Sequence, residues 1–135
     1  MKNTTLYFLQ NELIITDVSG LLSIPYIDIV SVYCDRPYLS IRTTYNRHFM
    51  IQQSLSNFIK NLPYFFCQCN RSVLVNMLHV EAIHKNTSCS IVTGNDTYTV
   101  SRRRVNIVLE YFLYVKQNIS KEYICYLCKN KIESI

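Results

Sequence analysis

The residues of this chain best suited to bind an anion are three consecutive arginines, Arg102, Arg103 and Arg104. They directly follow Ser101 and directly precede an apolar pattern with helical period, which places them in the first turn of a predicted helix. A helix N-terminus carries partial positive charge and favours Asp or Glu, so three cations there repel the helix dipole and one another. A phosphate group would neutralise them, because a helix N-terminus is a natural anion site. The triplet is equally compatible with a solvated basic turn.

The net charge is concentrated in the same part of the chain. The 135 residues carry a net charge of +5, and 49% of them are hydrophobic, which is enough for the core of one domain. Residues 1–100 hold seven Lys/Arg against six Asp/Glu, whereas residues 101–135 hold seven against three. The basic excess therefore begins at the arginine triplet, and it suggests an anionic polymer or surface as partner.

The pattern of apolar residues predicts neither a membrane span nor a secretory signal. Polar or charged residues interrupt each apolar stretch, and the N-terminus lacks the apolar segment and small-residue cleavage site of a signal peptide. We therefore expect a cytoplasmic protein with no membrane partner. The six cysteines are then expected to be free thiols and not a disulfide framework.

The elements that must position the arginines are mostly short strands. Alternating and β-branched segments predict strands over residues 12–18, 26–33, 38–43, 48–52, 65–75, 80–84, 90–93 and 97–100. Gly94-Asn95-Asp96 predicts a hairpin turn between the last two of these. The chain therefore reads as mainly β.

Two helices are predicted within this β pattern. Ser54 is a good N-cap for a short amphipathic helix that stops at Pro63. Ser101 is predicted to cap a second helix, with an apolar face formed by Val105, Val108, Leu109, Phe112 and Leu113. The tail, residues 116–135, is basic and is predicted to be helical in part, for example over residues 122–129.

From the short helix onward, a set of segments forms a recognisable pattern: Ser54-Leu55-Ser56-Asn57-Phe58, residues 66–76, Val80-Glu81-Ala82-Ile83, the Gly94 hairpin and Val100-Ser101-Arg102-Arg103. Through these residues, the chain resembles the LytTR DNA-binding domain of bacterial transcription regulators. In the family, the second stretch usually reads Phe-x-Arg-x-His-Arg-Ser-x-Leu-Val-Asn and the last reads Val-Ser-Arg-Arg. The resemblance covers roughly residues 6–114. Asn70 stands where His is usual and Gln68 where Arg is usual, which leaves the base preference open.

The resemblance implies an elongated β-β-β stack of small antiparallel sheets with short helices and a C-terminal helical tail. The DNA-binding domain would span residues 1–115, and residues 116–135 would form a basic extension. Loops, and not a recognition helix, would enter successive grooves on one side of duplex DNA. Three contact regions follow: the loop between Tyr33 and Tyr38, the Asn70-Arg71-Ser72 turn, and the Ser101-Arg102-Arg103 turn, where Arg103 would take the main major-groove position.

The chemistry of these residues agrees with DNA contact. Arg can donate two parallel hydrogen bonds to guanine O6 and N7, whereas Lys60, Lys85 and Arg104 are expected to contact phosphate. Arg36 could reach base or phosphate, and Tyr38 could hydrogen-bond a phosphate. The candidate DNA-binding residues are Arg36, Tyr38, Asn70, Arg71, Ser72, Lys85, Ser101, Arg102, Arg103 and Arg104.

Several candidates also have a purely structural interpretation. Arg71 could form an internal salt bridge with Glu81, and Arg36 could pair with Asp35 in an ordinary exposed loop. Ser72 and Ser101 could bind phosphate or serve only as turn and cap residues. Asn76 is expected to be structural, because its amide can satisfy backbone groups in the turn before Val80.

The cysteines and the acidic residues give little support to a metal site or an enzyme. Cys67-x-Cys69 and Cys125-x-x-Cys128 could in principle supply four zinc thiolates, but no glycine-rich knuckle accompanies either pair. A redox switch at Cys69 would need a thiol with a lowered pKa. No catalytic motif or paired carboxylates occur, so we expect no catalytic residues, no cofactor and no enzyme activity.

The sequence therefore predicts a transcriptional regulator that binds specific double-stranded DNA. Because family members often act at paired repeats, we expect a homodimer on DNA, and control by a regulatory protein partner is also open. The alternative is a protein-interaction or self-assembly module that retains the fold and uses its basic tail. Loss of sequence preference in Arg103→Ala would distinguish the first hypothesis from the second.

Overall fold

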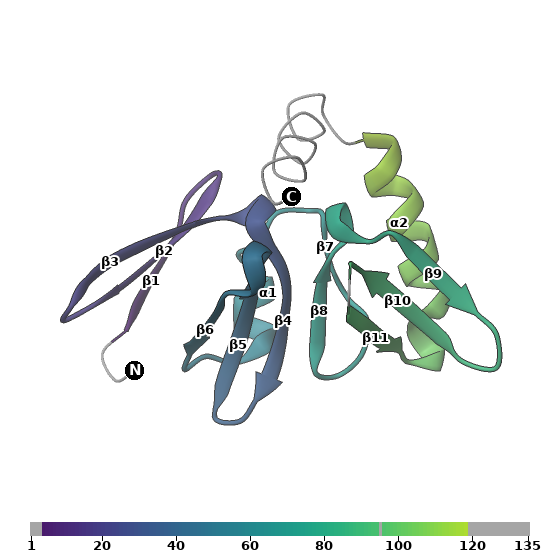
Figure 1. Cartoon of the computed structure of the whole chain (residues 1–135), viewed down its shortest axis with the longest axis horizontal. Coiled ribbons are helices and arrows are strands. Elements are labelled where there is room, and N and C mark those ends of the chain that lie inside the picture. The colour runs from purple at the N-terminus through teal and green to yellow at the C-terminus, as the bar shows by residue number, and fades with distance from the viewer. Residues whose placement is uncertain (1–3, 95, 119–135) are drawn as a thin grey trace.

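Three small antiparallel sheets make up most of the fold. The computed structural model describes residues 4–94 and 96–118, and its strands pair in the orders β1-β2-β3, β6-β5-β4-β8-β7 and β11-β10-β9. The sheets lie side by side along the long axis of the molecule, in chain order (Figure 1). The predicted mainly β class, a stack of small antiparallel sheets, is therefore confirmed.

The N-terminal sheet is formed by β1 (Thr5–Phe8), β2 (Glu12–Asp17) and β3 (Gly20–Pro25). Alternation in β2 places Leu13 and Ile15 in the core, as the period of two in a strand requires. Gly20 has φ +146°, a conformation that side chains rarely adopt, at the start of β3. This sheet projects from one end of the molecule (Figure 1).

The central sheet contributes more buried hydrophobic residues than either of the other two sheets. It consists of β4 (Ile29–Asp35), β5 (Tyr38–Thr43), β6 (His48–Ile51), β7 (Phe66–Gln68) and β8 (Val73–Asn76). The short helix α1 (Leu55–Ile59) follows β6, and Ser54 caps it as predicted, because its hydroxyl accepts a hydrogen bond from the Asn57 amide at 3.2 Å. Phe58 of α1 is fully buried in the core.

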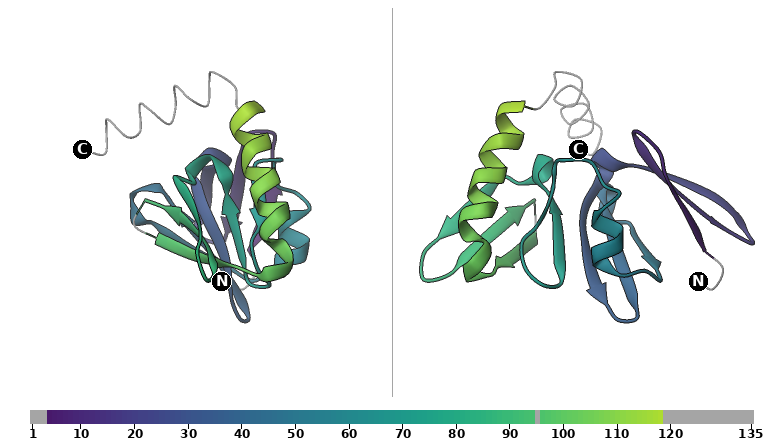
Figure 2. Two further views of the ribbon diagram at one scale, coloured as in Figure 1. Left: turned by 90° about the vertical axis from the view of Figure 1, so that its right-hand side faces the viewer. Right: turned by 180° about the vertical axis from the view of Figure 1, so that it is seen from behind.

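The third sheet is formed by β9 (Ala82–Lys85), β10 (Cys89–Thr93) and β11 (Asp96–Val100). The chain then passes through a 3-10 turn, η4 (Arg102–Arg104), into α2 (Val105–Asn118), which covers this sheet when the molecule is seen from behind (Figure 2). Val108 and Val115 are the fully buried residues of α2. The Tyr111 hydroxyl also anchors α2, since it donates a hydrogen bond to the Tyr64 carbonyl.

Several details differ from the sequence prediction, which includes neither β1 nor β3. Residues 26–33 were predicted as one strand, but a 3-10 turn, η1 (Tyr26–Asp28), precedes β4. The Asn76 side chain holds that turn by donating to the Ile29 carbonyl at 2.9 Å. Residues 65–75 are not one strand either, because β7 and β8 pair through a tight turn at residues 69–72. Leu113 was predicted on the apolar face of α2, but it is exposed, and Val115 takes the buried position.

Most of the predicted basic extension, residues 119–135, lies outside the described part of the chain. Its predicted start at residue 116 falls within the last turn of α2.

Candidate nucleic-acid interface

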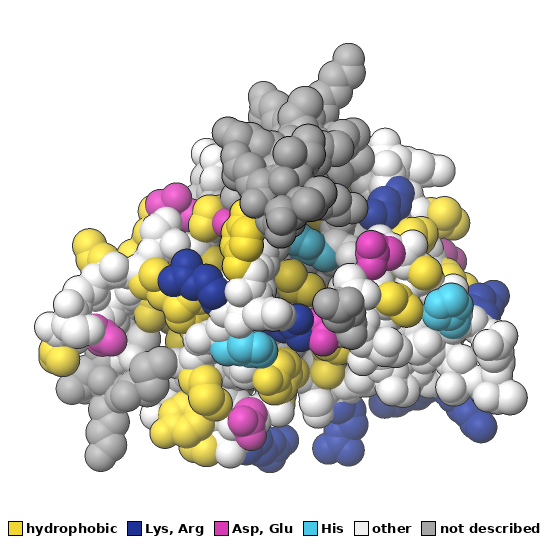
Figure 3. Space-filling view, in the orientation of Figure 1, with side chains coloured by type: hydrophobic (Ala, Val, Ile, Leu, Met, Phe, Trp, Pro, Cys, Tyr) yellow, Lys and Arg dark blue, Asp and Glu magenta, His cyan; other side chains and the backbone are white. Residues whose placement is uncertain are grey.

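The three turns that the resemblance singled out lie along one edge of the molecule. The β4–β5 hairpin, the β7–β8 turn and the β11–α2 connection all reach the lower edge in Figure 1, one after another along the long axis. Lys and Arg side chains gather along the same edge in the space-filling view (Figure 3). The fold therefore brings segments that are far apart in sequence into a single basic edge.

The first turn is the tip of the β4–β5 hairpin. Asp35 pairs with Tyr38 in the antiparallel register, so Arg36 and Pro37 form a two-residue tip. Arg36 is exposed and Tyr38 is half-buried. Asp35 and Arg36 both lie in the described part of the chain and form no ion pair with each other, so the alternative role suggested for Arg36 is not supported.

A hollow of about 660 Å³ lies beside this tip. Arg36 and Tyr38 from the hairpin, Gln52 and Ser54 from the segment before α1, and Gln68 and Arg71 from the β7–β8 turn all line it. The hollow therefore places Arg36, Tyr38 and Arg71, three of the predicted contact residues, around a single concave surface.

The second turn, residues 69–72, is stabilised by Asn70. Its side-chain oxygen accepts a hydrogen bond from the Ser72 amide at 2.8 Å, and its side-chain nitrogen donates to the Thr99 carbonyl at 2.7 Å. Arg71 and Ser72 themselves are exposed. Because both ends of the Asn70 amide are bonded within the domain, this residue ties the turn to β11.

The alternative salt bridge for Arg71 does not form. Glu81 instead accepts a hydrogen bond from the Gly94 amide at 2.6 Å, at the β10–β11 turn. Among the described residues, the ion pair found joins Arg42 and Asp96, and Arg71 has none. The guanidinium of Arg71 is therefore available to a ligand.

The third turn contains the arginine triplet and is bonded to the second turn. The Ser101 amide donates to the Cys69 carbonyl at 3.0 Å, and Arg104 Nη1 donates to the Gln68 carbonyl at 3.4 Å. Arg102 and Arg103 are exposed, whereas Arg104 is half-buried. Ser101 does not cap the helix with its hydroxyl, contrary to the prediction, because η4 intervenes before α2 begins. The second and third turns thus form one bonded unit.

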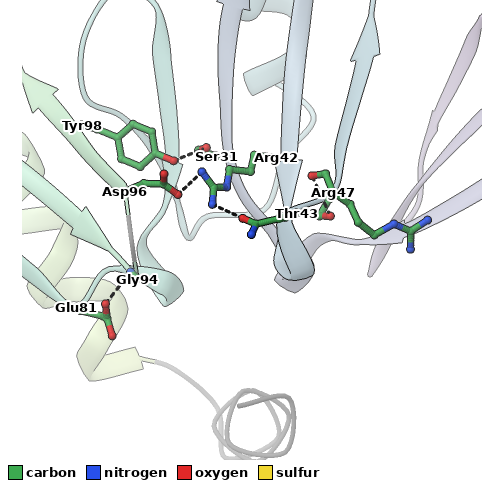
Figure 4. A network of polar contacts seen from close by, with 9 residues as sticks. Ser31, Arg42, Thr43, Arg47, Glu81, Gly94, Asp96 and Tyr98 are labelled. Atoms are coloured by element: carbon green, nitrogen blue, oxygen red, sulfur yellow. Dashed lines mark hydrogen bonds and ion pairs between the residues drawn. The ribbon is translucent and has the colours of Figure 1, made fainter. Parts of the chain in front are cut away.

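A polar network fixes the third sheet against the central sheet. Arg42 of β5 forms an ion pair with Asp96 of β11, and the Ser31 and Tyr98 hydroxyls share a hydrogen bond at 2.8 Å between β4 and β11 (Figure 4). Sequence patterns do not predict this network, because its partners are far apart in the chain and no local pattern links them. It holds the β4–β5 hairpin in a defined position relative to η4.

Lys85 lies apart from the three turns. It is exposed at the end of β9, in the sheet at the opposite end of the molecule from the N-terminal sheet (Figure 1).

The cysteines near the turns are not suited to redox sensing. Cys67 and Cys69 are buried, and burial raises the pKa of the Cys67 thiol to about 11 and that of Cys69 to about 12. A redox switch requires a lowered thiol pKa, and burial shifts the pKa of Cys69 in the opposite direction, which argues against that hypothesis. In the part of the chain that the structure describes, no three His, Cys, Asp or Glu side chains gather as metal ligands would. Cys125 and Cys128 lie outside that part.

No helix among the described residues is long and apolar enough to cross a membrane.

Comparison with known proteins identifies the family. A model of the LytTr DNA-binding domain matches residues 19–112, which is more than half of the chain. The chain is also similar in structure to a solved domain described as the LytTr DNA-binding domain of a methyl-accepting/DNA response regulator from Bacillus cereus. The two share 19% sequence identity and a TM-score of 0.66 over 76% of this chain and 97% of that one. No curated protein matches the chain. On the family match, the chain belongs to the LytTR family of DNA-binding domains.

Proposed function

We propose that this protein is a transcriptional regulator that binds specific double-stranded DNA through loops inserted into successive grooves. The observation that carries the proposal is the basic edge, where three turns and their cations lie in a row along the long axis (Figures 1 and 3). Loops arranged in this way can follow one side of a duplex. As such a regulator, the protein would act in the cytoplasm.

Two arginines are proposed to read bases. Arg103 is exposed on η4 and can donate two hydrogen bonds to one guanine in the major groove. Arg71 is exposed on the second turn, has no ion pair among the described residues, and is proposed to enter the neighbouring groove. Arg36 and Tyr38, which line the 660 Å³ hollow together with Arg71 of the β7–β8 turn, are proposed to bind the next segment of the backbone or a base edge.

The remaining candidates are proposed to fix the position of the protein on DNA. Ser72, Lys85, Ser101 and Arg102 would contact phosphates, which orient the protein but carry little sequence information. Arg104 would contribute from its half-buried position beside Gln68. We propose that Asn70 acts chiefly by holding its turn, since both ends of its amide are already bonded.

Selection from a pool of random duplex DNA at near-physiological salt tests the proposal. Wild type should enrich a motif, and Arg103→Ala should bind that motif about 5- to 150-fold more weakly and lose the preference at one base pair. Arg47→Ala is the matched control, because Arg47 is also an exposed arginine but stacks on Phe49 in the β6 region, away from the basic edge. It removes the same charge and should leave the motif unchanged.

Two results would contradict the proposal. Absence of any enriched motif with wild type would remove sequence-specific binding. Equal loss of affinity in Arg103→Ala and Arg47→Ala, with no change in motif, would show that binding depends on net charge and not on base reading by Arg103.

A further inference from the structure

The 660 Å³ hollow beside the β4–β5 hairpin has the size of a small-molecule site, because such sites usually measure about 300–1,000 Å³. Its walls are the hairpin tip, residues 52–56 before and within α1, and the β7–β8 turn. The three walls adjoin strands of one sheet, β6-β5-β4-β8-β7, so the hydrogen bonds of that sheet hold them in place. Seen from behind, α1 lies beside these strands (Figure 2). The hollow is therefore a preformed feature of the fold.

The charged side chains that line the hollow are both cations. Arg36 and Arg71 come from different turns, and no Asp or Glu is among the described residues that line it. Within the part of the chain that the structure describes, neither guanidinium forms an ion pair or a hydrogen bond. Arginine binds phosphate or carboxylate through two parallel hydrogen bonds, so two unpaired guanidinium groups around one concave surface favour an anionic ligand.

Three side-chain amides of the hollow also lack partners. Gln52, Gln53 and Gln68 all line it, and none of their side chains forms a hydrogen bond with another described residue. A carboxamide both donates and accepts hydrogen bonds, so it can pair with the edge of a heterocyclic base, and glutamine pairs in this way with adenine N6 and N7. A bare phosphate or carboxylate offers acceptors only. The amides therefore indicate a ligand that carries donors as well as acceptors.

The lining also includes an apolar surface. The Tyr38 ring is half-buried, and Leu39 and Leu55 are buried. Among the described residues, the Tyr38 hydroxyl forms no hydrogen bond that would fix its ring to a neighbour. Aromatic side chains stack on the rings of nucleic-acid bases. A ligand with a planar ring can therefore cover this apolar surface and stack on Tyr38.

A phosphate, a heterocyclic edge and a planar ring occur together in a nucleotide. We propose that the hollow binds a free adenine nucleotide, with its phosphate on Arg36 and Arg71 and its base against Tyr38 and the glutamine amides. The consequence for DNA rests on the proposed function, since Arg36, Tyr38 and Arg71 are also proposed DNA contacts. A bound nucleotide covers these side chains and neutralises the two cations. Nucleotide and DNA therefore exclude each other, and the nucleotide is an effector that releases the protein from DNA.

The size of this competition follows from linkage. When two ligands exclude each other, a nucleotide at about nine times its Kd weakens DNA binding by about tenfold, because only about a tenth of the free protein remains unoccupied. DNA weakens nucleotide binding reciprocally. The nucleotide acts on the free protein, so it lowers the affinity for every duplex by the same factor. The enriched DNA motif should therefore stay unchanged while its apparent affinity falls.

Calorimetric titration of the full chain at near-physiological salt tests the site without DNA. The probes are adenosine 5′-monophosphate, adenosine and ribose 5-phosphate. Wild type should bind adenosine 5′-monophosphate at least about tenfold more tightly than either fragment, because each fragment lacks one of the two linked sets of contacts. The double variant Gln52→Ala/Gln53→Ala should weaken that binding by about fivefold or more, since it removes the hydrogen bonds to the base. Neither glutamine is a proposed DNA contact, so affinity for the selected motif should stay within about twofold.

Matched variants separate the hollow from the rest of the surface. Gln10→Ala/Gln117→Ala removes two exposed glutamines that lie outside the hollow, and it should change neither nucleotide nor DNA binding. Arg36→Ala should weaken binding of adenosine 5′-monophosphate by at least about tenfold, because it removes a charged partner of the phosphate. Arg103→Ala removes the same charge from the third turn, outside the hollow, and should leave nucleotide affinity within about twofold.

The inference and the proposed function fail by different results. No binding of adenosine 5′-monophosphate at millimolar concentration would overturn the nucleotide site, and so would equally tight binding of ribose 5-phosphate or equal losses in Arg36→Ala and Arg103→Ala. Nucleotide binding that leaves the affinity for the selected motif unchanged would overturn the competition. Each of these results leaves the regulator intact. Absence of any enriched DNA motif would remove the regulator, and the titrations of the free protein would still decide the nucleotide site.

Discussion

The substitution Asn70→Ala separates the positioning of the second turn from the reading of bases. Alanine removes the hydrogen bond from Ser72 at 2.8 Å and the one to the Thr99 carbonyl at 2.7 Å, without changing the charge. Each such neutral bond contributes about 0.5–1.5 kcal/mol. Thr99 and Ser72 are exposed, so water can replace part of both bonds. The expected loss in the free energy of unfolding is therefore about 1–2 kcal/mol.

The effect on DNA binding should be uniform across sequences. Without Asn70, the β7–β8 turn loses its bond to β11 but keeps the Ser101–Cys69 backbone bond. Arg71 would then sample more conformations before binding. Ordering the Arg71 side chain on binding would then reduce the affinity for every duplex. The cost should be similar to that of immobilising one side chain with many rotamers, about 0.5–1.5 kcal/mol. The enriched motif itself should not change.

Urea denaturation and parallel selection from random duplexes measure both effects. Asn70→Asp is a useful second variant. It keeps the oxygen that accepts the hydrogen bond from the Ser72 amide, but it places a carboxylate oxygen next to the Thr99 carbonyl, where the two oxygens repel each other. It should therefore be no more stable than Asn70→Ala. If Asn70→Ala kept full stability and changed the preference at one base pair, Asn70 would be reading a base and the positioning role would be refuted.

Two further predictions concern the contact between sheets and the buried thiols. Asp96→Asn should lower the free energy of unfolding, measured in urea, by about 1–2 kcal/mol. This loss lies between those typical of exposed and of buried ion pairs, because the Arg42 and Asp96 side chains are 20% and 27% exposed. The double variant Arg42→Gln/Asp96→Asn should lose less free energy of unfolding than the sum of the losses in the two single variants. Because the folded pKa values of Cys67 and Cys69 are raised to about 11 and 12, their contribution to stability is complete below about pH 8.5. It should be lost as the pH rises from there toward 11–12, by up to about 1.4 kcal/mol per thiol per pH unit, and Cys67→Val/Cys69→Val should flatten this dependence in urea titrations at successive pH values.

Local signals predicted most of the elements, although not β1 or β3, and the resemblance singled out the three turns that form the basic edge. Ser54 caps α1, and Gly94, at φ +56°, begins the β10–β11 turn, because in both cases the controlling groups are a few residues apart. The apolar pattern predicted one continuous strand in place of the β7–β8 turn, because apolar residues occur on both sides of the turn. Its determinant is the Asn70 side chain, which also bonds Thr99, 29 residues away.

Contacts between the sheets could not be predicted from periodicity. Arg42 and Asp96 are 54 residues apart, and each would pass as an ordinary surface charge in its own strand. The same holds for the bonds that Cys69 and Gln68 carbonyls accept from the third turn. Backbone carbonyls carry no residue-specific signal, so the bonded unit of the second and third turns becomes visible only in the structure.

The position of the arginine triplet explains how the free protein tolerates it. The arginines form η4, one turn before α2, and no acidic residue in the first turn of α2 offsets them. Arg104 turns toward the Gln68 carbonyl, whose partial negative charge is favourable for a guanidinium. Arg102 and Arg103 remain exposed, where water and salt screen their repulsion. Repulsion among the arginines at this edge therefore destabilises the free protein only slightly. The same positive charges attract a nearby phosphate backbone, most strongly at low salt.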